Sequence, residues 1–252
     1  TVDRLGALVR VMYGQRRDTL PANMEIGATV FAFADLRPAL EAALRVDWPQ
    51  GRSHRALLLL AALLHDAAKR VTRSQDAEGA VPFYRHEQIG ATWARGRADA
   101  LHLSSAERDR ISTIIRHHMR PHWLNGEGAL SRRAVYRFWR DTGPAGVDIC
   151  LHAMADYLAT VGSTLGQTAW VRYLETVRGL LERYFLDYDT AIAPPALLDG
   201  HELMQQLGLE PGPIIGELLE QLREAQVEGL IGTKKDALAF ARRALNEHGT
   251  SD

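Results

Sequence analysis

Residues 57–69 read LLLLAALLHDAAK, an apolar helical run that ends in adjacent His65 and Asp66, with Lys69 three residues further on. Removing an imidazole or a carboxylate from water without a partner costs several kcal/mol, so a buried helix gains nothing by carrying both at its end. A His-Asp pair alone occurs by chance, but here the apolar run precedes it and a lysine follows it. We therefore interpret His65 and Asp66 as ligands of a divalent cation, which can bind both groups.

Three later segments offer more His and Asp side chains within helical, apolar patterns. They are residues 83–87 (FYRHE), 116–121 (RHHMRP) and 151–157 (LHAMADY). The candidate ligands in them are His86, His117, His118 and Asp156. The two adjacent histidines point about 100° apart on a helix, so we expect at most one of them to face the cluster. The polar neighbours of His86 are equally consistent with a surface histidine, and His152, one turn before Asp156, is a candidate partner behind the ligands.

The candidate donors are imidazoles and carboxylates, without thiolates. Such a set suits Mg²⁺, Mn²⁺, Fe²⁺, Co²⁺, Ni²⁺ or Zn²⁺, and these sites usually serve phosphoester chemistry or water activation. The order His-Asp, His, His-His, Asp resembles the HD superfamily of metal-dependent phosphohydrolases. The resemblance implies that one or two ions are held by the following residues: His65, Asp66, Asp156, His86 and one of His117 or His118.

The same resemblance makes Asp66, Lys69 and Arg85 candidate catalytic residues, with the two cationic side chains as contacts of the substrate phosphate. Long cationic side chains are usually solvated, so Lys69 and Arg85 are equally well explained as surface residues.

One ligand that the resemblance implies is missing. In that superfamily a first His lies on the preceding helix, in a stretch similar to residues 29–36 (TVFAFADL), but no His occurs before position 54. Phe33, which cannot bind an ion, takes its approximate place, and Asp35 is the nearby group that could stand in for it. His54 would lie about 16 Å from His65 along a shared helix, at a rise of ~1.5 Å per residue. We therefore expect a primary metal position that is weakened or lost, with any ion depending on His86 and the His117–His118 pair.

The second half of the chain resembles the region that follows the HD domain in bacterial CCA-adding tRNA nucleotidyltransferases and poly(A) polymerase-like proteins. The similar segments are residues 198–204 (LDGHELM), 207–216 (LGLEPGPIIG) and 224–238 (EAQVEGLIGTKKDAL), together with 103–121 and 131–138. In those proteins a preceding head domain, with a Gly-Ser pair and a paired-Asp motif, adds the nucleotides. Nothing upstream of the HD-like part matches that head, so we expect no nucleotide addition by this chain alone.

Local signals in the tail predict ordinary helices. Pro213 suits the first turn of a helix, and the apolar residues that follow it recur with 3.6 periodicity: Ile215, Leu218, Leu219, Leu222 and Ala225. Thr233 with Asp236 three residues later is typical of a helix N-terminus. These motifs predict packing helices and carry no chemistry.

Length and composition are typical of an all-α protein. The chain has 252 residues, rich in Ala, Leu and Arg, and convincing strand alternation is rare. The resemblance implies an HD-domain helical bundle followed by a small helical tail. We expect an N-terminal helical connector at 1–24, the HD-like domain at 25–190 and the tail at 191–252, with breaks at Leu20–Asn23 and Ala193–Pro195.

The single cysteine, Cys150, is expected to be a core residue and excludes a disulfide framework within one chain. No apolar run reaches ~18 residues and no signal peptide is visible, so we expect a cytoplasmic protein with no membrane partner. A net charge of −1 argues against a wholesale electrostatic clamp on nucleic acid.

Local positive charge could still contact RNA. The arginines concerned, interleaved with Tyr136 and Trp139, are Arg132, Arg133, Arg137 and Arg140. Such clusters are more often solvated helix faces. The leading hypothesis is an enzyme, a metal-dependent phosphohydrolase acting on a phosphomonoester or cyclic phosphodiester of a nucleotide or RNA end, with tRNA as a possible partner. The alternatives are a catalytically inactive tRNA- or RNA-binding module and, less well supported, a nucleotide-binding regulator.

Overall fold

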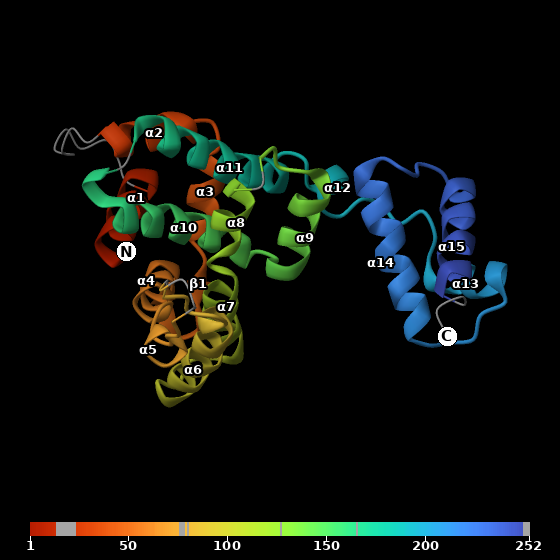
Figure 1. The fold of residues 1–252 in the computed structure, drawn as a ribbon, viewed down its shortest axis with the longest axis horizontal. Coiled ribbons are helices and arrows are strands. Elements are labelled where there is room, and N and C mark those ends of the chain that lie inside the picture. Colours follow the sequence, from red (N-terminus) through yellow and green to blue (C-terminus); the bar gives the residue numbers. More distant parts are fainter. Residues whose placement is uncertain (14–23, 76–78, 80, 127, 165, 249–252) are drawn as a thin grey trace. The chain divides into compact units, whose positions relative to one another are not determined.

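The computed structural model describes residues 1–13, 24–75, 79, 81–126, 128–164 and 166–248. Helices dominate these ranges, as Figure 1 shows. The sheet within them is an antiparallel pairing of two short strands, β1 (Asp47–Trp48) and β2 (Arg52–Ser53). The all-α prediction is confirmed. The predicted break at Leu20–Asn23 lies outside the described residues.

The chain forms two compact units. One comprises residues 1–130 and 141–185, and the other comprises residues 131–140 and 186–252. A short segment from the middle of the sequence therefore packs with the C-terminal helices. The three-part division expected from the sequence, with boundaries after residues 24 and 190, stays a prediction.

The first unit is built around one buried helix, α10 (Ala145–Val161), whose residues from 145 to 155 are all buried. The helices that pack on it are α1 (Val2–Tyr13), α4 (His54–Leu64), α7 (Ser105–His117), α8 (Arg120–Gly126) and α11 (Gln167–Phe185). The remaining helices of this unit are α2 (Met24–Ala32), α3 (Arg37–Leu44), α5 (Lys69–Thr72) and α6 (His86–Ala100), with 3-10 turns at Pro49–Gly51 and Gly162–Thr164. Cys150 on α10 is fully buried, as predicted.

Capping side chains set where two of these helices begin. Ser53 accepts a hydrogen bond from the backbone N–H of Ala56 at the start of α4. At the start of α7, Ser104 and Glu107 form a reciprocal capping box. The buried Glu107 also accepts two hydrogen bonds from Arg52, at 2.5 and 2.7 Å. The β1–β2 connection is thereby tied to α7 by a charged pair.

A buried polar chain connects β1, α4, α7 and α10. The indole N–H of Trp48 donates to Nδ1 of His54 at 3.0 Å, and His54 Nε2 lies 2.6 Å from Asp148 Oδ1. Arg110 donates to the other oxygen of Asp148, also at 2.6 Å. Because Nδ1 accepts from the indole, Nε2 carries the proton and donates it to the carboxylate. Both ring nitrogens of His54 are therefore hydrogen-bonded within the fold.

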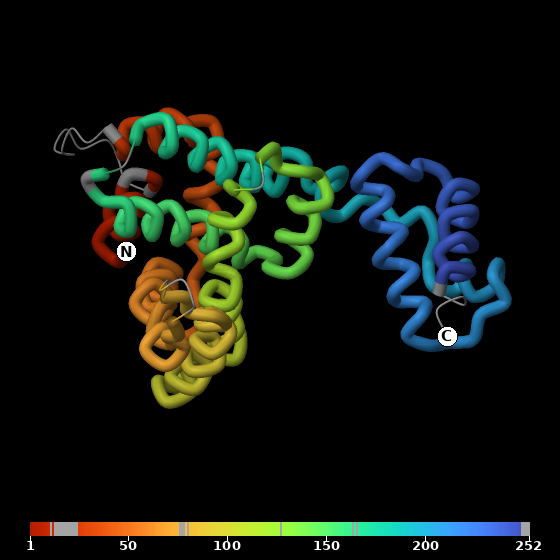
Figure 2. The backbone as a smooth tube through the Cα atoms, viewed as in Figure 1, coloured from red at the N-terminus to blue at the C-terminus, as the bar shows by residue number. Residues whose placement is uncertain are grey.

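The second unit contains α12 (Tyr188–Ala191), α13 (Gly200–Leu207), α14 (Pro213–Glu228) and α15 (Lys234–His248), together with most of α9 (Arg132–Thr142). Figure 2 traces the three longer C-terminal helices in blue. Helix α14 begins at Pro213 and buries Ile215, Leu218 and Leu222, as the periodicity predicts. Thr233 and Asp236 hydrogen-bond reciprocally at the start of α15, so the predicted cap is confirmed. Within the described ranges no helix is long and apolar enough to cross a membrane.

Candidate metal centre

Three histidines in the first unit share one hydrogen-bonding arrangement. His65 directly follows α4, His86 is the first residue of α6, and His118 directly follows α7. In each, Nδ1 lies 2.7–2.8 Å from the carbonyl oxygen three residues earlier. A carbonyl only accepts, so Nδ1 carries the proton, and in a neutral ring Nε2 keeps its lone pair. Histidines that bind metal ions through Nε2 are usually held this way.

The three Nε2 atoms converge on Asp66. His86 Nε2 and His118 Nε2 are 3.3 Å apart and lie 3.5 and 3.9 Å from Asp66 Oδ1. His65 Nε2 lies 3.2 Å from the other oxygen, Oδ2. Two nitrogen lone pairs at 3.3 Å repel each other unless a proton or a cation lies between them. We refer to these four residues as the His-Asp cluster.

Two buried atoms of the cluster have no hydrogen-bond partner in the described part of the chain. They are His65 Nε2 and Asp66 Oδ1. Leaving such atoms unsatisfied costs about 1–3 kcal/mol each. The ligand atoms of His65, Asp66 and His118 all lie within 4.8 Å of one another, close enough to bind one ion after small movements. The donor set therefore fits a divalent cation.

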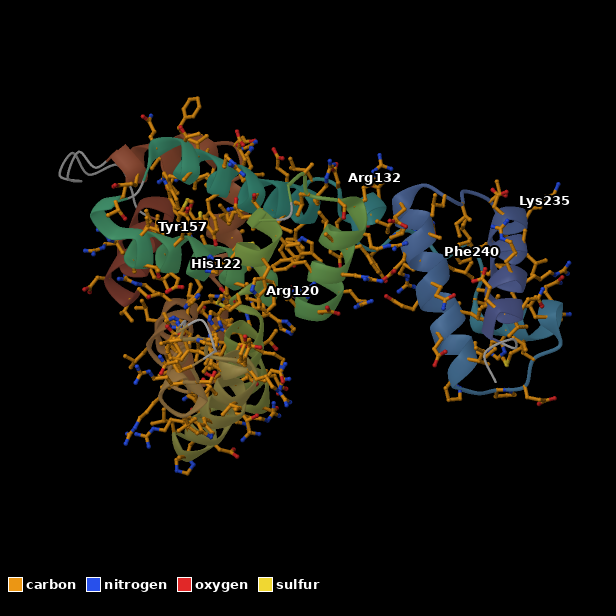
Figure 3. All side chains as sticks on the ribbon, in the orientation of Figure 1. Arg120, His122, Arg132, Tyr157, Lys235 and Phe240 are labelled. Carbon is orange, nitrogen blue, oxygen red and sulfur yellow. The ribbon has the colours of Figure 1, made fainter. Side chains whose placement is uncertain are left out.

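Asp156 on α10 extends the cluster. Its Oδ1 lies 3.4 Å from His65 Nε2 and accepts a hydrogen bond from the Thr1 hydroxyl at 2.8 Å. Its Oδ2 lies 3.7 Å from Nε2 of His122 on α8. Figure 3 shows His122 on α8 and Tyr157 on α10. The sequence reasoning missed His122 and Thr1, although His122 stands only four residues after His118.

Burial and charge act on the protonation of this cluster in opposite directions. Burial opposes protonation of His65, but attraction to the carboxylates of Asp156 and Asp66, 3.4 and 3.2 Å from its Nε2, outweighs burial and raises the pKa of His65 to about 9. Burial lowers the pKa of His118 to about 4. Burial raises the pKa values of Asp66 and Asp156, but attraction to the nearby positive charge of His65 outweighs it, so both pKa values lie below their usual range. At neutral pH, without a metal ion, a protonated His65 therefore pairs with two ionised carboxylates, and a cation that bound through its Nε2 would displace that proton.

The other predicted residues lie at different distances from the cluster. Lys69 Nζ donates to Asp66 Oδ2 at 2.8 Å. Arg85 is exposed and donates to the side chain of Gln88 at 3.1 Å, outside the cluster. His117 ends α7 half-buried, where burial and the nearby Arg120 charge lower its pKa. Of the two adjacent histidines, the structure brings His118 into the cluster and leaves His117 outside it.

His152, on the same buried helix as Asp156, lies behind two of the cluster histidines. Its ring packs edge-on against His65 and His118, with ring centres 4.6 and 5.7 Å apart. Both of its ring nitrogens are buried, and neither has a hydrogen-bond partner in the ranges that the structure describes. Burial lowers the pKa of His152 well below its usual value, so the ring is neutral.

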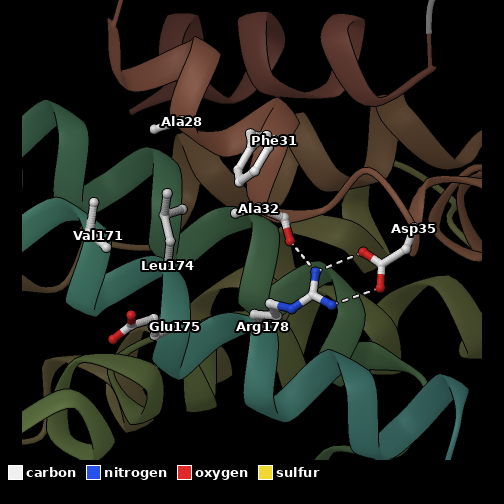
Figure 4. A pocket seen from close by; sticks show the side chains of 8 residues that line it. All are labelled: Ala28, Phe31, Ala32, Asp35, Val171, Leu174, Glu175 and Arg178. Atoms are coloured by element: carbon white, nitrogen blue, oxygen red, sulfur yellow. Dashed lines mark hydrogen bonds and ion pairs between the residues drawn. The ribbon is translucent and has the colours of Figure 1, made fainter.

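The HD resemblance implies a first histidine ligand, and Phe33 takes its approximate place by that resemblance. Phe33 is fully buried in the apolar core. Asp35 forms a bidentate ion pair with Arg178, in which both oxygen–nitrogen distances are 2.7 Å. These hydrogen bonds lower the pKa of Asp35 to about 2. Figure 4 shows this pair at a pocket between α2 and α11. Asp35 is therefore engaged with Arg178.

Three of the four arginines predicted to contact RNA pair with carboxylates within the second unit. Arg137 donates to both oxygens of Glu224, at 2.6 and 2.8 Å, and Arg133 lies 2.5 Å from Glu228. Arg140 forms an ion pair with Glu220. Three of the four cations thus connect α9 to α14, and Arg132 is exposed at the start of α9.

Two family models match the chain. The HD domain model matches residues 35–159, and the model of tRNA nucleotidyltransferase domain 2 matches residues 195–241. The chain is 36% identical over 195 residues to the A-adding tRNA nucleotidyltransferase of Deinococcus radiodurans, covering 76% of this chain and 42% of that enzyme. It is 35% identical over 182 residues to the CC-adding tRNA nucleotidyltransferase of Thermus thermophilus, covering 72% of this chain and 38% of that enzyme. The chain thus spans well under half the length of these relatives.

Proposed function

Because this chain carries an HD domain and is homologous to A-adding and CC-adding tRNA nucleotidyltransferases over most of its length, we propose that its His-Asp cluster is the centre of a metal-dependent phosphohydrolase. The substrate is a phosphomonoester or cyclic phosphodiester of a nucleotide or of an RNA end. The relatives are named for their action on tRNA, so the end of a tRNA is the first RNA to test.

One observation carries the proposal. Three imidazoles from three different helix ends each direct Nε2 at the same carboxylate, and each is oriented by its own backbone carbonyl. A histidine that serves only packing normally satisfies both nitrogens, as His54 does with Trp48 and Asp148. In the cluster, His65 Nε2 and Asp66 Oδ1 are buried and have no hydrogen-bond partner among the described residues.

The residues that would hold the ion or ions are His65, Asp66, His86, His118 and Asp156. Because three of these donors are imidazoles, the site favours Mn²⁺, Fe²⁺, Co²⁺ or Ni²⁺ over Mg²⁺, which prefers oxygen ligands. A divalent cation bound there would lower the pKa of a water molecule and neutralise charge on the phosphoryl oxygens.

Lys69 is the cation best placed to meet a substrate phosphate. Its ammonium group lies 2.8 Å from Asp66 Oδ2 and over the ring of Phe83, 5.6 Å from the ring centre. The side chain is partly exposed, so it reaches solvent while it remains oriented by Asp66. Arg85 lies on the exposed side of the α6 start and would need to leave Gln88 to take part.

The test combines metal content with hydrolysis. Purified chain is freed of metal with a chelator, reloaded with Mn²⁺, Co²⁺, Ni²⁺ or Mg²⁺, and assayed on a 2′,3′-cyclic nucleotide, a nucleoside monophosphate and a tRNA with a 3′-phosphate. We expect metal-dependent turnover that His65→Ala and His118→Ala abolish. His117→Ala is the matched control, because it removes an adjacent imidazole that lies outside the cluster. Equal turnover in wild type and His65→Ala would refute the proposal.

A second candidate function is an RNA-binding module without hydrolysis. The buried Phe33, in the approximate place of the first family ligand, is the observation that favours it. This candidate predicts a chain without stoichiometric metal that binds tRNA with an affinity that falls as salt rises. Absence of metal and turnover from the wild-type protein, together with salt-dependent tRNA binding, would select this function over the phosphohydrolase.

A further inference from the structure

The HD resemblance implies a first histidine ligand, and by that resemblance Phe33, which cannot bind an ion, takes its approximate place in this chain. We propose that His122 on α8 supplies a nitrogen donor from the other side of the Asp156 carboxylate. It would act as a metal ligand together with His65, Asp66 and Asp156. This inference rests on the proposed metal centre. It assigns a metal-binding role to a residue outside the His-Asp pattern.

The first ground is the position of His122 relative to Asp156. The two oxygens of this carboxylate face different imidazoles, with Oδ1 3.4 Å from His65 Nε2 and Oδ2 3.7 Å from His122 Nε2. His122 Nε2 is buried and has no hydrogen-bond partner within the described chain. Like His65 Nε2, it is a buried nitrogen without a hydrogen-bond partner, and the two nitrogens face different oxygens of the same carboxylate.

The second ground is how the ring of His122 is held. Its Nδ1 lies 3.1 Å from the hydroxyl of Tyr173, and its ring packs against Tyr157 and Tyr173, with ring centres 6.3 and 5.4 Å away. These two tyrosines stack on each other at 4.2 Å. When Nδ1–H donates to the Tyr173 oxygen, the Nε2 lone pair faces Asp156. Cluster histidines are oriented in the same way, with a carbonyl in place of the phenol.

The third ground is how the carboxylates divide the cluster. Asp66 Oδ1 faces His86 and His118, whereas Asp66 Oδ2 faces His65. The half of the centre around His65 thus has one imidazole and two carboxylates. Adding His122 gives this half two imidazoles and two carboxylates.

Cobalt binding tests the inference without reference to turnover. The chelator-treated 252-residue chain is titrated with Co²⁺, and the visible d–d absorption and the metal retained after desalting are recorded. The variants are His122→Ala, the near-isosteric His122→Gln and Tyr173→Phe, with His117→Ala as the control outside the cluster and His65→Ala as the variant that removes a cluster ligand. Far-UV circular dichroism establishes that each variant is folded.

We expect both His122 variants to bind Co²⁺ at least about 10-fold more weakly than wild type and to show a changed d–d spectrum, since even groups that only orient a ligand contribute about 10–100-fold to affinity. Tyr173→Phe should weaken binding to a smaller extent, and His117→Ala should match wild type. Wild-type affinity and spectrum in both His122 variants, with binding lost in His65→Ala, would overturn this inference alone. A wild-type chain that binds no Co²⁺ would overturn it together with the proposed function.

Discussion

The ion pairs between α9 and α14 lead to a prediction that separates packing from RNA binding. Arg137 presents Nε and Nη2 to the two oxygens of Glu224, at 2.6 and 2.8 Å. The Glu224 side chain is 11% exposed, whereas that of Arg137 is 48% exposed. Arg140 also reaches the same carboxylate, at 3.4 Å. We expect Arg137 to serve mainly as a structural partner of Glu224.

The magnitude follows from this geometry. Hydrogen bonds to charged groups contribute about 1.5–3 kcal/mol when buried. Because about half of the Arg137 side chain is exposed to solvent, screening reduces the contribution of this ion pair to the free energy of unfolding to about 1–2 kcal/mol. Glu224→Gln and Arg137→Gln should each lower the free energy of unfolding by about that amount. The double variant should lose little more than either single variant, because the same interaction is removed.

The assay is a double-mutant cycle by urea denaturation, followed by far-UV circular dichroism, with Arg132→Gln as the control. That arginine is exposed on the same helix, so its replacement should change the free energy of unfolding by less than about 0.5 kcal/mol. Effects of Arg137→Gln and Glu224→Gln that add within about 0.3 kcal/mol would show that the pair is not coupled and would refute the structural role.

The same variants test the RNA hypothesis directly. If Arg137 is held by Glu224, then Arg137→Gln should leave tRNA affinity and its salt dependence unchanged. If Arg137 contacts a phosphate, Arg137→Gln should weaken tRNA binding. It should also reduce the slope of log affinity against log salt concentration by about one, while Glu224→Gln should strengthen tRNA binding. Weaker tRNA binding in Arg137→Gln would therefore support α9 as a candidate RNA contact.

Three further outcomes are expected. Asp148→Asn should lower the free energy of unfolding by about 1.5–3 kcal/mol, because the new amide nitrogen would face the N–H donor of Arg110. A loss below about 0.5 kcal/mol, measured by urea denaturation, would contradict this expectation. Hydrogen bonds from Arg52 hold the pKa of Glu107 at about 2, below its ordinary value of 4.5, so ionised Glu107 stabilises the fold above pH 4.5 and this stability is lost as pH falls towards 2. The stability gap between wild type and Glu107→Gln should therefore narrow between those pH values in urea denaturation, and a constant gap would contradict it. Mn²⁺ supplied to chelated chain at 100 times its Kd should raise the free energy of unfolding by about 2.7 kcal/mol, seen as a higher thermal midpoint that His65→Ala removes; an unchanged wild-type midpoint would count against the metal centre.

Local features of the sequence predicted the helical elements well. The apolar face of α14 and its start at Pro213 follow from 3.6 periodicity and from the fixed φ of proline, both of which act within a few residues. The N-terminal cap at Thr233 is likewise a contact between residues three positions apart. The same locality makes His65 and Asp66 neighbours whatever the rest of the chain does.

Packing of one helix against another decided what periodicity could not. Adjacent histidines point about 100° apart, and only the packing of α7 against α4 and α6 determines that His118 rather than His117 meets Asp66. The partner of Asp35 lies 143 residues away at Arg178, a distance in sequence at which no local pattern carries information.

By itself, then, the sequence determined the helices, the identity of the donors on them and the likeness to HD domains, because those properties depend on nearby residues. The tertiary structure alone decided which donors share a site. His65 and Asp66 meet His118, more than fifty residues along the chain, and Asp156 meets His122, because α4, α7 and α8 each pack on α10. Side chains that are solvated or paired in isolation become buried and unsatisfied only when those helices close around them, and that burial is the physical reason to expect a cation there.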